Sequence, residues 1–215
     1  EALVKRGARH LLLASRHPVI VLESVEEERV RSLVIAAATQ LRLPTFEWSV
    51  TQGLRRSEER ERQSGITANP AKLLAHLADM EVRAVFVAHD LHEHLDDPTL
   101  VRLARDLVVR LAQMGATLVL TGAAIALPAP LEAEAVRVRV ALPSRQDIAL
   151  MLQALVQATG AHVVAGALDR AADALQGLTL NQARQAAAAV MVNGALDLDD
   201  AAQLLERKVR EISDG

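Results

Sequence analysis

The feature that most constrains the fold is the alternation of strand-like and helix-like segments over the first 142 residues. Five short runs rich in β-branched residues lie at 18–23, 45–50, 83–88, 117–121 and 135–140. Between them, apolar residues repeat at helical spacing, over 30–41 and again over 100–114. Alternating strands and helices indicate a parallel sheet covered by helices on both faces. We therefore predict an α/β fold with a three-layer αβα core and a five-stranded parallel sheet.

The pattern changes after Pro143, where the strand-like runs stop. Four helical patterns follow, at residues 144–159, 165–175, 179–193 and 199–212. Glycine commonly ends helices, and three glycines separate these patterns: Gly160, Gly177 and Gly194. The sequence thus predicts two parts, a core over residues 1–142 and a small helical bundle over residues 143–215.

The segment over residues 52–69 is charged, lacks apolar periodicity and ends in turn-forming residues. Such a segment is typical of a long mobile loop. Its arginines and glutamates interleave, so their fields largely cancel. We predict a solvated loop here, and not a nucleic-acid patch.

The overall composition argues against several classes of function. A net charge of −3 gives no broad positive field for binding nucleic acid by counterion release. A base-stacking platform is not expected either, because the only aromatic residues are Phe46, Trp48 and Phe86. The chain has no cysteine, which excludes disulfides and thiolate metal sites and fits a reducing cytoplasm.

The sequence shows no sign of a membrane span or an export signal. No run approaches 18 consecutive apolar residues, and no charged-then-apolar leader opens the chain. We expect a cytoplasmic protein with no membrane contact. The sequence begins at Glu1 without a methionine, so we also expect it to be part of a longer protein.

The first strand-to-helix turn, within residues 18–34, lies where a nucleotide-binding α/β domain would carry its phosphate loop. A Walker-type loop needs glycines, a lysine for the β- and γ-phosphates, and a serine or threonine for the metal. This turn instead reads Ser24, Val25, Glu26, Glu27 and Glu28. The three carboxylates favour the helix by complementing its dipole, but they repel a phosphate. The sequence therefore predicts a phosphate-binding scaffold that has lost its phosphate site.

A five-stranded αβα domain followed by a small helical bundle is the layout of AAA+ proteins. The motifs AVFVAHDLHEHLDDP (84–98), TLVLTGA (117–123) and GLTLNQARQA (177–186) resemble the Walker B strand, the sensor-1 strand and the lid helix that carries sensor 2. With TFEWSVTQGLR (45–55) and LPSRQDIALML (142–152), they are similar to a more specific domain. This is the amino-terminal, phosphate-loop-free AAA domain of a tandem AAA ATPase family.

That family is found in cyanobacteria and other bacteria, and some algal chloroplast genomes encode it as a hypothetical reading frame. The resemblance covers nearly the whole chain. It implies that a second, complete AAA module follows this domain in the intact protein, and that ATP and Mg²⁺ are used there. For this chain itself we predict no bound cofactor and no catalytic residue.

The resemblance implies a vestigial nucleotide-site region made of Ser24, Glu26, His89, Asp90, Thr121 and Arg184. Active Walker B strands end in an Asp that helps to hold the metal and a Glu that polarises the attacking water. Here His89 and Asp90 are followed by Leu91, so one of the two acids is missing in either register. We expect Asp90 to cap the turn after the strand, with a vestigial nucleotide contact as the alternative.

The richest run of potential ligands contains His89, His92 and His94, with Glu93, Asp96 and Asp97 beside them. Histidine and carboxylate groups suit Zn²⁺. The spacing H-x-x-H-x-H does not match an i, i+4 pair on a helix, and no cysteine completes a tetrahedral set. We predict surface histidines and no metal site, with an adventitious metal as the alternative.

Three arginines stand near positions that matter in AAA+ proteins. Arg137 and Arg139 lie on the fifth predicted strand, near where some members present an arginine finger to a neighbouring subunit. Alternating Arg and Val is also typical of a half-exposed edge strand, which is the structure we expect here. Arg184 is three residues from Asn181 and so lies on a similar helical face. We name Arg137 and Arg139 as candidates for a partner interface.

The function that fits these observations is a pseudo-ATPase domain for assembly, docking or regulation. Its partners would be a catalytic AAA module in the same protein and neighbouring subunits of an oligomer. One alternative is a clamp-loader subunit of the delta type, against which the net acidity and the scarcity of aromatics weigh. Another is weak nucleotide binding or hydrolysis, against which the missing lysine and the missing Walker B acid weigh.

Overall fold

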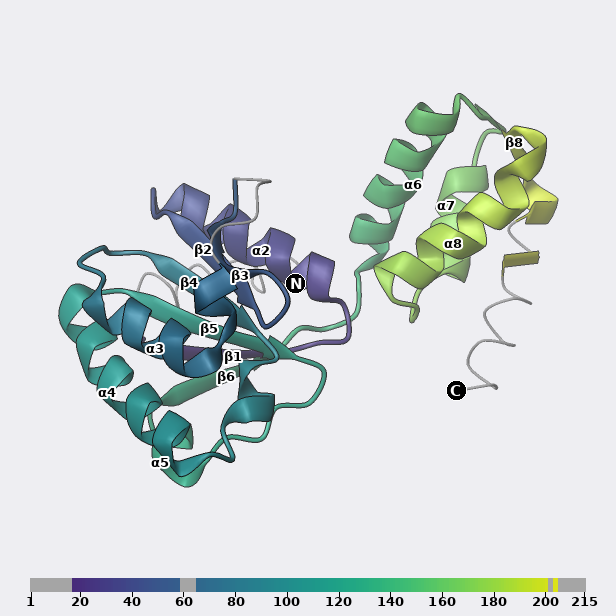
Figure 1. Ribbon diagram of the computed structural model, residues 1–215. Coiled ribbons are helices and arrows are strands. Elements are labelled where there is room, and N and C mark those ends of the chain that lie inside the picture. The colour runs from purple at the N-terminus through teal and green to yellow at the C-terminus, as the bar shows by residue number, and fades with distance from the viewer. Residues whose placement is uncertain (1–16, 59–64, 201–202, 205–215) are drawn as a thin grey trace. The chain divides into compact units, whose positions relative to one another are not determined.

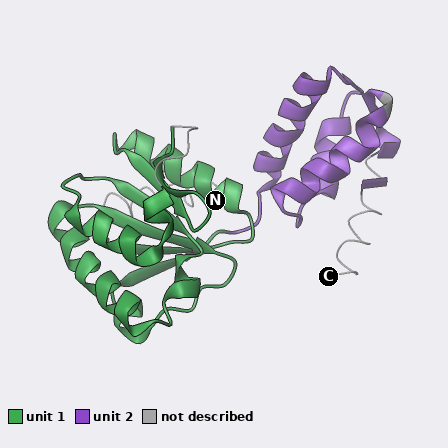
Figure 2. Ribbon diagram, viewed as in Figure 1, with its two compact units in different colours: residues 1–140 green, residues 141–215 purple. Residues whose placement is uncertain are grey.

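The computed structural model describes residues 17–58, 65–200 and 203–204. The chain divides into two compact units, residues 1–140 and residues 141–215 (Figure 2). Each unit has buried hydrophobic clusters of its own.

Unit 1 is built on a mixed sheet with the strand order β3-β2-β4-β5-β1-β6. The strands are β1 (Val19–Glu23), β2 (Thr45–Ser49), β3 (Gly53–Arg56), β4 (Val85–His89), β5 (Thr117–Gly122) and β6 (Ala135–Arg139). The five predicted strands are all present and parallel, whereas β3 runs antiparallel to β2. The α/β fold is confirmed, and the count of five strands is wrong because the sheet has six.

The extra strand arises within the predicted loop over residues 52–69. Gly53 adopts φ 71°, which lets the chain turn back so that Leu54 pairs with Trp48. The Leu54 side chain is buried, and its backbone N–H donates to Thr67 Oγ1 at 2.9 Å. Trp48 Nε1 also donates to the backbone carbonyl of Thr67, at 2.5 Å. The mobile-loop prediction is therefore wrong for the described ends of this segment, and residues 59–64 lie outside the described residues.

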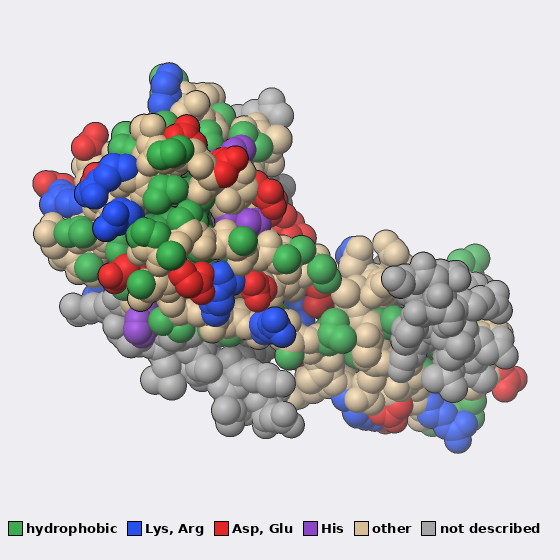
Figure 3. All heavy atoms as spheres, turned by 90° about the horizontal axis from the view of Figure 1, so that it is seen from below, with side chains coloured by type: hydrophobic (Ala, Val, Ile, Leu, Met, Phe, Trp, Pro, Cys, Tyr) green, Lys and Arg blue, Asp and Glu red, His purple; other side chains and the backbone are tan. Residues whose placement is uncertain are grey.

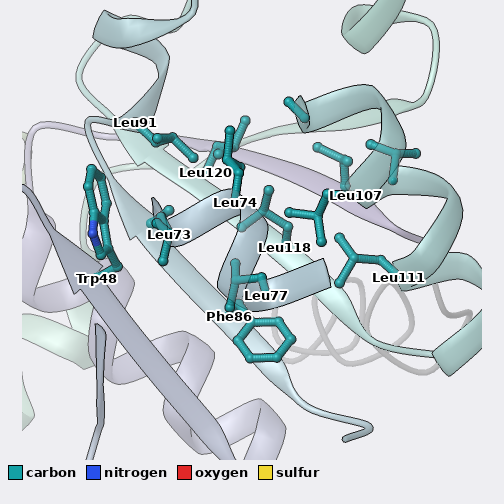
Figure 4. Packing of buried hydrophobic residues seen from close by; sticks show 14 of the residues in the cluster. Trp48, Leu73, Leu74, Leu77, Phe86, Leu91, Leu107, Leu111, Leu118 and Leu120 are labelled. Carbon is teal, nitrogen blue, oxygen red and sulfur yellow. The ribbon is translucent and has the colours of Figure 1, made fainter. Parts of the chain in front are cut away.

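Helices cover both faces of the sheet (Figure 1). On one face, α2 (Glu27–Gln40) packs its buried residues Val30, Val34, Ala37 and Ala38 against apolar residues of β1, β4 and β5. On the other face lie α3 (Pro70–Asp79) and α4 (Pro98–Met114). Figure 4 shows their leucines packed around the strand residues Trp48, Phe86, Leu118 and Leu120. The helical patterns over 30–41 and 100–114 are thus confirmed, and α3 was not predicted.

Local signals explain where these helices begin. Asn69 and Asp97 precede α3 and α4, and their side chains accept hydrogen bonds from Lys72 N and Thr99 N. Each of these helices has a proline in its first turn, where a missing N–H costs nothing. The described part of unit 1 also contains three shorter segments: η1 (Gly65–Ala68), η2 (Leu91–His94) and α5 (Ala129–Glu132).

Unit 2 is a small helical unit. It contains α6 (Arg145–Thr159), α7 (Ala167–Ala174), α8 (Leu180–Val190), η3 (Met191–Asn193) and a short parallel pair, β7 (His162–Val163) and β8 (Ala195–Leu196). Capping boxes at Ser144 and Thr179 begin α6 and α8. The first three helical patterns are confirmed and the strand pair was not predicted. The fourth pattern, 199–212, falls largely outside the described residues.

Candidate functional site

The predicted nucleotide-site region lies at the carboxyl edge of the sheet in unit 1. Strands β4, β5 and β1 are neighbours in the sheet, so their carboxyl ends lie side by side. Ser24 N donates to the carbonyl of Gly122 at 2.9 Å, and Asp90 N donates to that of Thr121 at 3.0 Å. The structure therefore brings together five of the six residues named from the sequence: Ser24, Glu26, His89, Asp90 and Thr121. The sixth, Arg184, lies on α8 in unit 2.

The turn between β1 and α2 is too short to enclose a phosphate. Three residues, 24–26, join Glu23 to Glu27, and the turn contains neither glycine nor lysine. Its local hydrogen bond runs from Glu26 N to Ser24 Oγ, at 3.0 Å. The Glu26 carboxylate pairs with Arg29 at 2.9 Å, whereas the Glu27 side chain is 63% exposed in the first turn of α2. This arrangement presents negative charge where a phosphate loop would present amides and a lysine.

Two of the three clustered histidines are buried, so the prediction of surface histidines is wrong for them. The side chains of His89 and His92 are 9% and 6% exposed. His89 Nδ1 lies 2.9 Å from Thr121 Oγ1 and 3.8 Å from Glu27 Oε1. Burial follows from the sheet and from η2, which folds the His92 ring over β5. A Cβ on Gly122 would lie 2.6 Å from His92 Cε1, so this close approach requires glycine.

The ring nitrogens of His92 have different surroundings. His92 Nε2 lies 3.1 Å from Glu93 Oε1, and His92 Nδ1 is buried without a hydrogen-bond partner among the residues that the structure describes. His94, in contrast, is partly exposed and meets the edge of the Trp48 ring. Within residues 17–58, 65–200 and 203–204, no three His, Cys, Asp or Glu side chains come together as a metal-binding group.

Asp90 ends β4 in an unusual backbone conformation. Its φ of 54° lies in the left-handed region, which Asp tolerates better than most residues. The predicted side-chain cap is not formed, and the Asp90 backbone carbonyl instead accepts a hydrogen bond from Glu93 N at 3.1 Å. The next residue, Leu91, is buried in the core on the α3 and α4 side. An apolar core residue thus occupies the position after Asp90.

A polar pocket of about 320 Å³ lies beside this edge and was not predicted from the sequence. Its lining includes Glu27, Glu28, Arg31, Glu47, Arg55 and His89. Glu47 Oε2 accepts hydrogen bonds from Arg31 Nε at 2.8 Å and from Arg55 Nη2 at 3.0 Å. The Glu47 side chain is only 3% exposed, which alone would raise its pKa. Hydrogen bonding from Arg31 and the two positive charges lower the pKa below its ordinary value.

Strand β6 is an edge strand, as predicted, but its two arginines differ in their surroundings. Arg137 donates to both carboxylate oxygens of Glu132 at 2.6 Å, to Glu23 Oε1 at 2.7 Å and to the carbonyl of Ile125 at 2.8 Å. The hydrogen bond to Glu132 raises the pKa of Arg137, and in return lowers that of Glu132. Arg139 is 91% exposed, and its Nε lies 3.6 Å from Glu23 Oε2. The Arg137 side chain is therefore held by hydrogen bonds within unit 1, and the Arg139 side chain faces solvent.

The remaining candidate, Arg184, is a surface residue of unit 2. Arg184 Nη2 donates to Asn181 Oδ1 at 3.1 Å, which confirms that the two residues share a helical face. On the face that Figure 3 shows, blue and red side chains are interspersed over the part of the chain that the structure describes. Among the described residues, no helix is long and apolar enough to cross a membrane.

Solved structures with a similar fold are AAA+ proteins. The FIGL-1 AAA domain in complex with ADP matches with a TM-score of 0.62 and 14% identity, over 89% of this chain and 71% of that one. The Thermotoga maritima RuvB Holliday junction branch migration motor matches with a TM-score of 0.62 and 13% identity, over 94% and 68%. At these identities the likeness shows a common AAA+ fold and no more.

Two relatives are similar in sequence, each described as uncharacterized AAA domain-containing protein ycf46. The chain is 24% identical to that of Guillardia theta over 185 residues, which cover 84% of this chain and 36% of the relative. It is 22% identical to that of Trieres chinensis over 205 residues, which cover 94% and 41%. The chain thus spans less than half the length of these relatives.

Family models match almost the whole chain in two consecutive parts. Residues 10–140 match the model described as SpoVK-like AAA ATPase, N-terminal domain. Residues 146–214 match the model described as SpoVK-like AAA ATPase, second domain. The resemblance noted in the sequence is therefore confirmed, and the chain belongs to the SpoVK-like AAA ATPase family.

Proposed function

We propose that this chain is a non-catalytic AAA domain, a pseudo-ATPase that serves the assembly, docking or regulation of a catalytic AAA module. The observation that carries the proposal is the turn of residues 24–26 between β1 and α2. It has no glycine and no lysine, and the helix that follows holds Glu27 and Glu28 in its first turn. A triphosphate needs backbone amides that wrap around it and a cation that offsets its charge. This turn supplies carboxylates in their place.

The end of β4 supports the same proposal. Metal-assisted attack on a phosphoryl group needs one acid to hold the metal and another group to orient the water. Asp90 supplies a single carboxylate here, and the adjacent Leu91 is 1% exposed within the hydrophobic core. His89, on the other side, is hydrogen bonded to Thr121. Among the described residues at the end of β4, one of the two acids that hydrolysis would use is therefore missing.

The catalytic module belongs to the intact protein in this proposal. The relatives are more than twice as long as the part that matches this chain. We infer that a second AAA module follows, that it uses ATP and Mg²⁺, and that this domain contacts it and neighbouring subunits in a cytoplasmic oligomer. The absence of cysteine fits a reducing compartment, and the net charge of −3 favours protein partners over nucleic acid.

Arg139 is the residue of β6 best suited to contact a partner. It is 91% exposed, and its contact with the Glu23 carboxylate, at 3.6 Å, is longer than a hydrogen bond. An arginine that becomes desolvated at an interface can contribute about 2 kcal/mol or more to binding. Arg137 is less suitable because its truncation would remove a hydrogen-bond donor from each of Glu132, Glu23 and the Ile125 carbonyl.

The test is to place Arg139→Glu in the intact protein and measure its assembly by sedimentation velocity, together with ATP turnover. We expect half-assembly to require a roughly tenfold or higher concentration, since charge reversal removes the anchor and adds repulsion. Arg83→Glu is the matched control, because Arg83 is also exposed but precedes the amino end of β4. Unchanged assembly and turnover in Arg139→Glu would leave the proposed docking role without this surface.

A further inference from the structure

Glu23, the last residue of β1, contacts two other segments of unit 1 at the carboxyl edge of the sheet. Its backbone carbonyl accepts a hydrogen bond from Val140 N at 3.1 Å, just beyond the end of β6. Its Oε1 accepts one from Ile125 N at 3.3 Å, in the segment between β5 and α5. The backbone and the side chain of one residue thus bind the end of the edge strand and the segment after β5.

The carboxylate of Glu23 also meets both arginines of β6. Arg137 Nη1 lies 2.7 Å from Oε1, and Arg139 Nε lies 3.6 Å from Oε2. The Glu23 side chain is 19% exposed, so these contacts are partly shielded from water. Glu132 is the second acid of the group and binds Arg137 alone among these residues. The two negative charges of the carboxylates therefore offset the two positive charges of the guanidinium groups at this end of β1 and β6.

Glu23 lies at a position where related folds commonly bind an anionic ligand. In parallel α/β folds, the turn that follows a strand at the carboxyl edge is where anionic ligands bind. Glu23 directly precedes that turn in β1, which is paired with β6. Its own carboxylate contacts the two arginines of β6. At this edge of the sheet, the negative charge beside the arginines of β6 is therefore supplied by the Glu23 carboxylate and not by a ligand.

We propose that Glu23 acts as a built-in anion that locks β6 and the segment after β5 to the β1–α2 turn without any ligand. The inference deepens the proposed function and rests on it in one respect, that the domain works without nucleotide. Strand β6 is the last element of unit 1, and the chain passes from it into unit 2. The lock therefore fixes the residue from which the second unit departs, in every nucleotide state of the partner module.

Glu23→Gln tests the proposal because it keeps the size of the side chain and one acceptor oxygen for Ile125 N, while it removes the charge and replaces the other oxygen by an NH2 donor. Amide hydrogen exchange resolved to single residues is the measurement. Loss of a charge-assisted hydrogen bond predicts exchange about tenfold faster at Val140 and in β6. Exchange in β4 should stay unchanged, which shows that the fold is intact.

Glu132→Gln is the matched control, since Glu132 binds Arg137 and has no contact with Val140 or Ile125 among the interactions described above. We expect exchange at Val140 to change by less than about twofold in this variant. Equal effects of the two substitutions, or none from Glu23→Gln, would overturn the proposal. Neither outcome depends on nucleotide binding, so a failure here is distinct from a failure of the proposed function.

Glu23→Gln could loosen the whole unit, and faster exchange in β4 would reveal this. Arg137→Gln then decides, because Arg137 Nη1 donates to Glu23 Oε1 at 2.7 Å and the Arg137 side chain lies outside the hydrophobic core. The proposal requires faster exchange at Val140 with β4 unchanged. No change at Val140 in Arg137→Gln would contradict it.

Discussion

At the scale of single residues, Glu47 shows how the carboxyl edge depends on internal charge pairs. Its carboxylate is buried on β2 and is bound by Arg31 from α2 and by Arg55 from β3. The three residues therefore link a helix and two strands on the face of the sheet that α2 covers. A buried carboxylate is tolerated only with such partners, because burial without them would favour its neutral form.

This triad predicts a pH dependence of stability. The folded pKa of Glu47 lies below its ordinary value of 4.5, so the ionised carboxylate stabilises the fold above that value. The stabilisation is lost as the pH falls through the folded pKa. Glu47→Gln should lower the free energy of unfolding at neutral pH by about 1–3 kcal/mol. It should also make the decline in stability below the ordinary pKa of 4.5 shallower than in the wild type.

Denaturant unfolding followed by Trp48 fluorescence at several pH values checks this expectation. Glu81→Gln is the control, because Glu81 is exposed and its profile should follow that of the wild type. Parallel pH profiles for the wild type and Glu47→Gln would show that the triad contributes nothing to acid sensitivity.

At the scale of elements, β3 is the strand whose contribution can be isolated most cleanly. Leu54 is 7% exposed, whereas Ile66, in the adjacent η1, is 64% exposed. We expect Leu54→Ala to lower the free energy of unfolding by about 2–4 kcal/mol, because it leaves a cavity. Ile66→Ala should cost less than about 0.5 kcal/mol. Thermal or denaturant unfolding measures both variants. Equally small losses of unfolding free energy in Leu54→Ala and Ile66→Ala would support the interpretation of this segment as a mobile loop.

The elements that could be predicted from the sequence are those with long apolar patterns. Strands β1, β4 and β5 and helices α2 and α4 each present several buried apolar residues, whereas β2 and β6 were recognisable from their alternation and β-branched residues. Strand β3 could not be predicted, since it has four residues and a single buried apolar side chain, Leu54. The pair β7 and β8 has two residues in each strand, which is too short for any periodicity.

The candidate site was predictable only in part, for a similar reason. The turn with Glu26, Glu27 and Glu28 could be placed because it directly follows a recognisable strand. The partners of Glu47 could not, because Arg31 is 16 positions before it and Arg55 is eight positions after it. The burial of the His92 side chain, in η2, depends on the close approach of its ring to Gly122 at the end of β5. The charge pairs of Glu47 and the burial of His92 therefore depend on contacts between segments that are distant in the sequence.

At the scale of the whole molecule, the fold and the family are those of ATPases, whereas the residues at the carboxyl edge of the sheet do not suit nucleotide binding. The chain belongs to an ATPase family and has the AAA+ fold. Its carboxyl edge nevertheless places carboxylates, an internal ion network and a core leucine where nucleotide chemistry needs amides, a lysine and two acids. Because this chain covers 36% and 41% of its two relatives, catalysis can reside in another part of the intact protein.

The central claim is that this domain does not bind nucleotide. The most direct test is calorimetric titration of the 215-residue chain with Mg-ATP, with the intact protein titrated in parallel. The account predicts no saturable heat for the chain up to about 1 mM ATP and no rise in its melting temperature, because a ligand that does not bind the folded state cannot stabilise it. It predicts one bound nucleotide per intact protein chain. Saturable binding to the 215-residue chain with a Kd in the micromolar range (~1–100 μM) would contradict it.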